Sequence, residues 1–220
     1  DYKANRKIQR ITNWEGFDNR EEESASIENQ ILRLIQYLRC LPVDLLSFDK
    51  VEADDVIAHL TQKLDGEVYI MSADQDFLQL VNDKVTVYSP IKKKFYTPKL
   101  VKEEYGLYPQ NYINKKILMG DNSDNVPGVK GLGDKKLFKL FPELAELEPI
   151  TLKDIFEKCE AKRQEHGLYE DICNFKKQLL INSQLMDLKE VDIPEDGLEE
   201  IELVLTNEPN KMDKLAFLKL

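Results

Sequence analysis

The pattern of apolar and polar positions predicts alternating helices and strands in the first third of the chain. Apolar residues recur at helical spacing through residues 27–39, so we expect an amphipathic helix there. A short apolar run at 43–48 predicts a strand. A second helix is expected to open at 51–60, where apolar residues follow a group of acids. The run 68–71 predicts a buried strand that leads into a polar loop.

The middle of the chain predicts two further strands followed by two helices. Residues 85–89 and 94–96 alternate in type on either side of a proline-containing segment, which indicates two strands joined by a turn. Pro98 and Pro109 each stand at a favoured first helical position, since the missing N–H would have no partner there. We therefore expect one helix from Pro98 to Tyr105 and another from Pro109 to Met119.

Beyond residue 140 the pattern is mainly helical. Helices are expected over 150–163, 168–180 and 212–220. The stretches 182–188 and 194–197 are interpreted as non-helical breaks between them. No internal repeat and no low-complexity linker divides the chain, so we expect one domain with a helical C-terminal portion.

Charge and cysteine content narrow the function classes. The net charge is −10, which counts against a simple basic nucleic-acid binder. The basic residues are nevertheless gathered at 3–10, 92–94 and 130–139, and local patches decide phosphate binding. No apolar run approaches the roughly 20 residues that a membrane span needs. The three cysteines lack metal-type spacing, which predicts buried thiols in a reducing compartment.

Carboxylates gather at the beginning of the helix expected after residue 50. Glu52, Asp54 and Asp55 occupy three of four consecutive positions. Acids at a helix N-terminus are favoured by the helix dipole, which is the simpler interpretation. Three acids exceed what a helix start needs, however, and their mutual repulsion favours a bound cation.

Two more acidic pairs follow along the chain. Asp74 and Asp76 come directly after a predicted parallel strand, at the sheet edge where ligands bind in α/β proteins, although helix capping is an alternative. Asp121 and Asp124 lie three residues apart in a turn, where two carboxylates are able to share one metal ion. The sequence therefore predicts a metal site with contributions from several elements.

A glycine-punctuated loop follows the last acidic pair. It contains Gly128, Lys130, Gly131 and Gly133 and leads into a basic amphipathic segment at 134–140. Glycines before a helix expose backbone N–H groups to a phosphate. A metal site beside a phosphate-binding loop indicates chemistry on a nucleic acid. The lysines at 92–94, in contrast, are most simply a solvated turn.

The order of these stretches resembles the 5′ nuclease family. The matching segments read VEADD, SADQDF and LMGDNSDNVPGVKGLGDKKL, and residues 2–6 are similar to the YKxNR segment of that family. The family includes flap endonucleases, the 5′→3′ exonuclease domain of bacterial DNA polymerase I, and phage members such as phage ribonuclease H. The stretch Trp14–Phe17 looks most similar to the phage members.

The resemblance implies an α/β fold of the PIN-like 5′ nuclease type. We expect a central, mostly parallel sheet flanked by helices, with a helix–three-turn–helix DNA-binding motif and a helical C-terminal portion. The implied segments are an arch at 1–26, a catalytic core at 27–125, the DNA-binding motif at 117–140 and the helical portion at 141–220.

The resemblance also implies two Mg²⁺ or Mn²⁺ ions. Glu52 and Asp54 would hold the first ion, and Asp55 would bridge or join the second group. The second ion would be held by four aspartates: Asp74, Asp76, Asp121 and Asp124. A K⁺ ion is implied at the glycine loop. Hard cations of this kind take oxygen ligands, which agrees with an all-carboxylate set.

DNA contacts are implied at both ends of this region. Lys3 and Arg6 would contact the scissile phosphate, and Tyr2 would stack on a base. The loop would grip the duplex through six residues: Gly128, Lys130, Gly131, Gly133, Lys135 and Lys136. The implied function is a structure-specific nuclease of replication or repair that cuts branched or nicked duplex DNA, or an RNA/DNA hybrid, carrying a 5′ single strand. The resemblance also implies replication proteins as partners, a monomeric state and no membrane association. It further implies a location in the cytoplasm of a bacterium or of a phage-infected host.

One departure leaves alternatives open. Family members carry two further aspartates before the YKxNR segment, and the match here begins at Tyr2. A DNA-binding remnant with an incomplete metal site is therefore the second hypothesis. A PIN-like ribonuclease is the third, and the loop at 128–133 argues against it because such nucleases need no duplex clamp.

Overall fold

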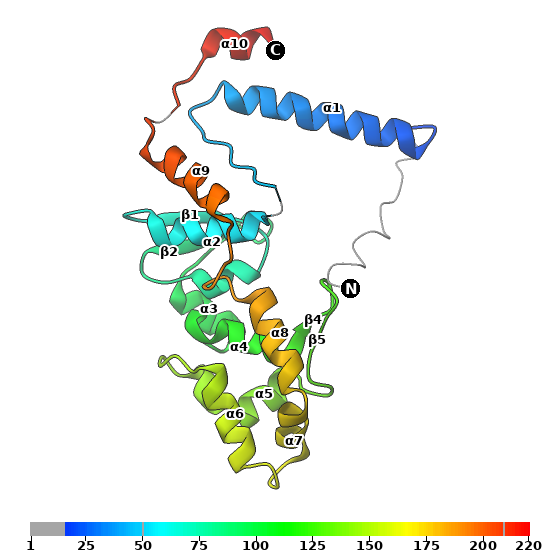
Figure 1. The fold of residues 1–220 in the computed structure, drawn as a ribbon, viewed down its shortest axis with the longest axis vertical. Helices are drawn as coiled ribbons and strands as arrows, with labels where there is room; N and C mark the ends of the chain where they lie inside the picture. Colours follow the sequence, from blue (N-terminus) through cyan, green and yellow to red (C-terminus); the bar gives the residue numbers. More distant parts are fainter. Residues whose placement is uncertain (1–15, 50, 209) are drawn as a thin grey trace. The chain divides into compact units, whose positions relative to one another are not determined.

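The computed structural model describes residues 16–49, 51–208 and 210–220 (Figure 1). The chain folds into two compact units. The first contains Ala53–Asp192, and the second contains the described part of residues 7–52 together with Ile193–Leu220. The tyrosine, lysine and arginine predicted at positions 2, 3 and 6 lie outside the described residues.

A three-stranded sheet forms the centre of the first unit. Its strands are β1 (Val68–Met71), β2 (Val85–Ser89) and β3 (Lys94–Tyr96), in that order across the sheet. β1 pairs with β2 in parallel, with Val68 opposite Val85, and β2 pairs with β3 in antiparallel fashion, with Val87 opposite Tyr96. The three predicted strands are confirmed, and alternate residues of β2 enter the core as the period-2 pattern requires. The expectation that β1 is buried is wrong, because β1 lies at the edge of the described sheet: Ile70 is buried, but Tyr69 and Met71 are 61% and 73% exposed.

Helices next to the sheet build the first core. They are α2 (Ala53–Lys63), the 3-10 helix η2 (Asp76–Leu80), α3 (Pro98–Tyr105) and α4 (Pro109–Met119). Both proline-initiated helices are confirmed. The core includes Phe77 and Leu78 of η2, Val101 of α3 and Tyr112 of α4, all buried against the inward residues of the sheet. Because the whole of η2 after its first residue is buried, the position of Asp76 is fixed by packing.

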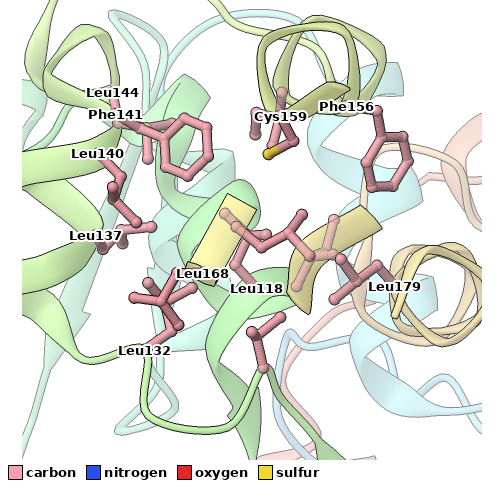
Figure 2. Close-up of a cluster of buried hydrophobic side chains, with 14 of the residues drawn as sticks. Leu118, Leu132, Leu137, Leu140, Phe141, Leu144, Phe156, Cys159, Leu168 and Leu179 are labelled. Atoms are coloured by element: carbon pink, nitrogen blue, oxygen red, sulfur yellow. The ribbon is translucent and has the colours of Figure 1, made fainter. Parts of the chain in front are cut away.

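A second core holds the helical part of the first unit together. Its elements are β4 (Gly120–Asp121), β5 (Val126–Pro127), α5 (Asp134–Leu140), the 3-10 helix η3 (Pro142–Ala145), α6 (Leu152–Ala161), α7 (Gly167–Asn174) and α8 (Lys176–Met186). Figure 2 shows Leu118 of α4, Leu132 and Leu137 converging with Cys159 and Leu179 from the later helices. The acidic turn and the glycine loop are therefore both attached to one buried cluster.

The second unit is helical. It contains α1 (Arg20–Arg39), α9 (Glu195–Thr206) and α10 (Lys214–Lys219). The helix expected over 27–39 is confirmed and begins earlier, because the Asn19 side chain caps it by accepting a hydrogen bond from the Glu22 N–H at 2.9 Å. Tyr37 and Phe217 meet edge to face at 5.1 Å between ring centroids, which attaches α10 to α1.

Two of the predicted elements are wrong in detail. Residues 43–48 form no strand, and no strand of the described residues offers them a partner; the Val43 carbonyl instead accepts a hydrogen bond from Asn210 at 3.1 Å. The single helix expected over 168–180 is two helices joined at Phe175, whose backbone N–H ends α7 on the Asp171 carbonyl at 2.9 Å. The apolar residues keep their helical spacing across the break, so the periodicity of the sequence alone does not reveal it.

The stretches 182–188 and 194–197, which were expected to be breaks between helices, are largely helical. Residues 182–186 continue α8, because Leu179 and Met186 lie two turns apart on its buried face. The stretch 194–197 begins α9, since Pro194 directly precedes the helix and Glu195 and Asp196 occupy the first turn, where acids are favoured. The polar residues that suggested a break therefore belong to the start of a helix or to the buried face of one.

The composition of the chain also led to expectations about its cysteines and about membrane-spanning segments. Cys40 and Cys159 are buried and Cys173 is half-buried, and all three are free thiols, as expected for thiols of structural type. Among the described residues, no helix has the length and apolar character needed to cross a membrane.

Candidate metal centre

Three carboxylates from two distant segments meet in the first unit. Asp76 begins η2, directly after the loop that follows β1, whereas Asp121 and Asp124 belong to β4 and the turn after it. Each contributes an oxygen, and these oxygens all lie within 4.8 Å of one another. The three side chains are half-buried. A single divalent cation is able to contact all three, which the family resemblance implied, together with Asp74, as ligands of one ion.

Short-range hydrogen bonds shape the loop that carries Asp76. The Ser72 hydroxyl accepts from the Asp74 N–H at 3.0 Å, and the Asp74 carboxylate accepts from the Asp76 N–H at 2.9 Å. Each is the local side-chain-to-backbone bond that serine and aspartate favour in turns. Asp74 thus lies beside Asp76 and fixes the backbone that presents it, although it is not one of the three clustered carboxylates.

The acidic turn is fixed in a similar way. The Asp121 carboxylate accepts from the Ser123 N–H at 2.8 Å and from the Ser123 hydroxyl at 2.5 Å. The turn is closed by the ladder of β4 and β5, in which Asp121 lies opposite Val126. Asn125 adopts φ 60°, a left-handed conformation that asparagine tolerates better than most residues.

The base of the turn requires glycine at two positions. Gly120 adopts φ 71°, and a Cβ there would lie 2.4 Å from the Gly128 nitrogen. A Cβ on Gly128 would lie 1.9 Å from the Met119 carbonyl oxygen. The backbones at the two glycines are therefore in direct contact. Gly128, predicted as a phosphate contact, has an immediate role in packing this base.

Lys116 neutralises part of the acidic cluster. Its Nζ lies 2.7 Å from Asp76 Oδ1 and 2.5 Å from Asp121 Oδ2, and its side chain is largely buried. Burial alone would lower the pKa of Lys116, but the hydrogen bonds to Asp121 and Asp76 outweigh burial and raise it. The ammonium group occupies a place between two carboxylates where a metal cation would also be stabilised.

The two aspartates that share Lys116 titrate differently. Burial raises the pKa of Asp76, the neighbouring Asp74 and Asp121 add a little to the rise, and the hydrogen bond and charge of Lys116 offset only part of it. Burial also acts on Asp121, but hydrogen bonds from Lys116 and Ser123 outweigh it and lower its pKa to about 2. Asp121 is therefore ionised at neutral pH and ready to bind a cation.

Removal of the Lys116 charge is expected to increase the response of the fold to divalent cations. In Lys116→Met, Asp76 and Asp121 lose their shared counter-charge, so the metal-free protein should lose about 1–3 kcal/mol of unfolding free energy. Saturating Mn²⁺ should restore most of this loss, because it binds the folded state. Thermal denaturation with and without Mn²⁺ measures the effect. Lys139→Met, which removes an exposed lysine elsewhere, should show the wild-type response.

The other predicted ligands lie on neighbouring or separate segments. Asp54 and Asp55 occupy the first turn of α2, half-buried, and are not part of the three-carboxylate group. Glu52 precedes α2 and falls in the second unit. The assignment of Glu52 and Asp54 to the first ion, and of Asp55 to a bridging position or the second group, stays a prediction.

The glycine loop leads into α5 as predicted. Gly133 directly precedes the helix, and the loop between the glycines is anchored by buried Val129 and Leu132. The remaining predicted contacts are exposed: Lys130, Gly131, Gly133, Lys135 and Lys136. Lys136 donates from Nζ to the Gly131 carbonyl at 2.8 Å, and Gly131 adopts φ 78°. Apolar side chains thus anchor the loop while its polar groups face outward.

The site also includes Lys116, Ser123 and the buried Asn182 of α8. The sequence motifs did not single out these three residues. Lys116 lies in the last turn of α4, where a lysine is usually explained by the helix dipole. Five residues separate it from Asp121, and only the turn at Gly120 brings the two side chains together.

This fold and site define an α/β protein with a cluster of carboxylates suited to a divalent cation, next to a glycine loop that opens a helix. The sequence matches the 5'-3' exonuclease N-terminal resolvase-like domain over residues 1–106 and the 5'-3' exonuclease C-terminal SAM fold over residues 107–208. It is also 32% identical over 207 residues to the 5'-3' exonuclease of Buchnera aphidicola (Schizaphis graminum), covering 92% of this chain and 68% of that protein. The chain belongs to the 5′–3′ exonuclease family and is a 5′ nuclease by class, as the motifs predicted.

Other relatives agree with this placement. The chain is 35% identical over 190 residues to DNA polymerase I of Bacillus subtilis, covering 82% of this chain but only 21% of the polymerase. Among solved structures, a bacteriophage T5 flap endonuclease in complex with DNA and metal ions is similar in fold, with a TM-score of 0.70, 21% identity, and coverage of 94% of this chain and 77% of that one. The expected PIN-like fold with a helical portion is confirmed.

Proposed function

We propose that this protein is a structure-specific, metal-dependent 5′ nuclease that hydrolyses phosphodiesters where a 5′ single strand meets a DNA duplex. The observation that carries the proposal is the meeting of Asp76, Asp121 and Asp124 within 4.8 Å in a chain of the 5′–3′ exonuclease family. Three half-buried carboxylates this close together repel one another, and a bound divalent cation would relieve that repulsion, as the Lys116 ammonium does for Asp76 and Asp121.

The donor set fits Mg²⁺ or Mn²⁺. All the candidate ligands are carboxylate oxygens, which these hard cations prefer, and the position of the Lys116 ammonium supports a cation-binding site. We propose that Asp76, Asp121 and Asp124 hold one ion, with Asp74 in support. We further propose that Glu52 and Asp54 hold the other ion, and that Asp55 bridges the two ions or joins the group of Asp76, Asp121 and Asp124. When bound, such ions activate a water molecule and stabilise the leaving oxygen of a phosphodiester.

The residues near the site would then position the substrate. Asp121 is kept ionised by Lys116 and Ser123, so it is available as a ligand at neutral pH. The exposed loop at 128–133 and Lys130, Lys135 and Lys136 would bind the duplex backbone, with a K⁺ ion at the loop carbonyls. Such contacts carry no sequence information, which suits an enzyme that recognises a junction.

We also propose that the predicted arch at residues 1–26 contacts the substrate. Lys3 and Arg6 would contact the scissile phosphate and Tyr2 would stack on a base of the 5′ strand. The natural role would be removal of 5′ strands, or of RNA primers from an RNA/DNA hybrid, during replication or repair, by a monomer in the cytoplasm of a bacterium or an infected host, alongside other replication proteins. The names of the relatives, 5′–3′ exonuclease and DNA polymerase I, support this setting.

A comparison of substrates tests the proposal. The purified chain is incubated in Mg²⁺ or Mn²⁺ with a 5′-flap duplex, a nicked duplex and single-stranded RNA, each labelled at the 5′ end. We expect short 5′ products from the flap and the nick, none after chelation, and little from the RNA. Tight binding to the flap without cleavage would indicate a DNA-binding remnant instead. Preferential cleavage of the RNA would indicate a PIN-like ribonuclease.

A further inference from the structure

Asn182 connects α8 to the two segments that flank the acidic turn, the end of α4 and the strand β5. It is completely buried, and its side-chain amide donates to the Ile117 carbonyl at 3.0 Å and to the Pro127 carbonyl at 2.8 Å. Ile117 lies just before Gly120, and Pro127 lies just after Asn125, so the two carbonyls flank the turn. One side chain therefore joins the segment entering the acidic turn to the segment leaving it.

The geometry of the amide is fixed from both sides. Its oxygen accepts a hydrogen bond from Gln178 at 3.0 Å, which leaves the nitrogen facing the two carbonyls. α8 itself is held by Leu179, one turn before Asn182 on the same face, which enters the core that also contains Leu118 (Figure 2). The bond therefore ties the turn to a firmly packed helix.

The carbonyl of the buried Ile117 needs this donor, and the same amide also bonds the carbonyl of the exposed Pro127. Ile117 is in the last turn of α4, where carbonyls lack intrahelical partners. Pro127 belongs to a two-residue strand at the end of a short ladder. Buried carbonyls without a donor are costly, so the amide stabilises one backbone arrangement over others.

We propose that Asn182 is a positioning residue for the metal centre: it fixes the turn that carries Asp121 and Asp124 at the distance from Asp76 that a divalent cation requires. The inference rests on the proposed function, since it assigns a role within the same metal centre. Asp76 is carried by η2, whose apolar residues belong to the core around the sheet, whereas the acidic turn is attached to the second core, so a shift of the turn changes the spacing among the three carboxylates. Residues that orient metal ligands typically change metal affinity or activity by about 10–100-fold when they are replaced.

Asn114 offers a matched control. It is also a buried asparagine, 3% exposed, and its side-chain amide donates to the Ile150 carbonyl at 2.7 Å. Its partner lies just before α6, well separated along the chain from the acidic turn. Asn114→Ala therefore removes the same kind of buried bond without touching the strands that carry the carboxylates.

The experiment compares metal binding in three variants of the full chain. Mn²⁺ affinity is measured by titration calorimetry without DNA, and the Mg²⁺ concentration for half-maximal flap cleavage is measured separately. We expect Asn182→Ala to weaken Mn²⁺ binding and raise the Mg²⁺ midpoint about 10-fold or more. Asn182→Ser, which keeps one donor, should give an intermediate shift. Asn114→Ala should stay within about twofold of wild type, and flap affinity should be unchanged in all three.

Two results would overturn the inference. One is an equal metal affinity in Asn182→Ser and wild type when both are folded. The other is an equal loss in Asn182→Ala and Asn114→Ala, which would assign Asn182 a general packing role. If Asn182→Ala does not fold, the comparison of Asn182→Ser with Asn114→Ala decides in the same way. Absence of cleavage by the wild-type chain would count against the proposed function alone, because calorimetry still tests the metal centre.

Discussion

Replacement of Asp121 by asparagine is expected to reduce flap cleavage by about 1000-fold while DNA affinity stays within about twofold of wild type. Asp121 is one of the three clustered carboxylates, and its hydrogen bonds to Lys116 and Ser123 keep it ionised. Asparagine keeps the size of the side chain but loses its charge, so the site should bind Mg²⁺ poorly. Removal of several kcal/mol of transition-state stabilisation corresponds to a loss of this size, since each 1.36 kcal/mol is tenfold in rate.

The control for this variant is Asp171→Asn. Asp171 is an exposed acid of α7, so its replacement makes the same change in net charge away from the carboxylate cluster. Cleavage rates and flap affinities are measured for both variants at several Mg²⁺ concentrations. Asp171→Asn should behave as wild type. Cleavage by Asp121→Asn at more than a tenth of the wild-type rate in saturating Mg²⁺ would show that the cluster is not the catalytic metal site.

The motifs indicated the two segments whose carboxylates meet, although Asp74, which was expected with them, is not in the cluster. Asp76 follows a strand that the apolar run at 68–71 predicts. The pair Asp121 and Asp124 has spacing suited to one ion. The boundaries of β2, β3, α3 and α4 could also be predicted, because period-2 alternation and proline at a first helical position are local signals.

The residues that hold the site in place could not be predicted from local patterns. Lys116 contacts Asp76 from 40 residues further along the chain, and Asn182 contacts Ile117 from 65 residues away. Their partners are brought near only by the packing of α4 against η2 and α8. A polar residue inside a helix has several ordinary explanations, so its sequence context alone does not indicate a buried role.

The misplaced strand at 43–48 illustrates a related limit. An apolar run favours a strand only where another strand is available to pair with it. In the structure Val43 and Leu45 remain 40% and 45% exposed, and the segment is held by Asn210. Propensity was therefore overridden by the absence of a partner strand in the described part of the second unit.

The most destabilising single substitution is expected at Gly128. Its Cβ would lie 1.9 Å from the Met119 oxygen, 2.1 Å from the Met119 carbonyl carbon and 2.6 Å from the Gly120 nitrogen. These are backbone atoms, so no side-chain rotation relieves the overlap. Gly128→Ala should therefore lower the unfolding free energy by at least about 3 kcal/mol, a large part of the 5–15 kcal/mol typical of a domain. Urea denaturation followed by circular dichroism measures the shift of the midpoint.

Gly133→Ala is the matched control within the same loop. A Cβ at Gly133 meets nothing within 4 Å, and the backbone there has φ −116°, which alanine adopts without strain. Its unfolding free energy should change by less than about 1 kcal/mol, because only the helix-capping preference and the chain entropy of glycine are affected. A variant Gly128→Ala as stable as Gly133→Ala would mean that the two strands below the acidic turn separate easily. In that case the close contact of Gly120 and Gly128 could not be what fixes Asp121 and Asp124 beside Asp76.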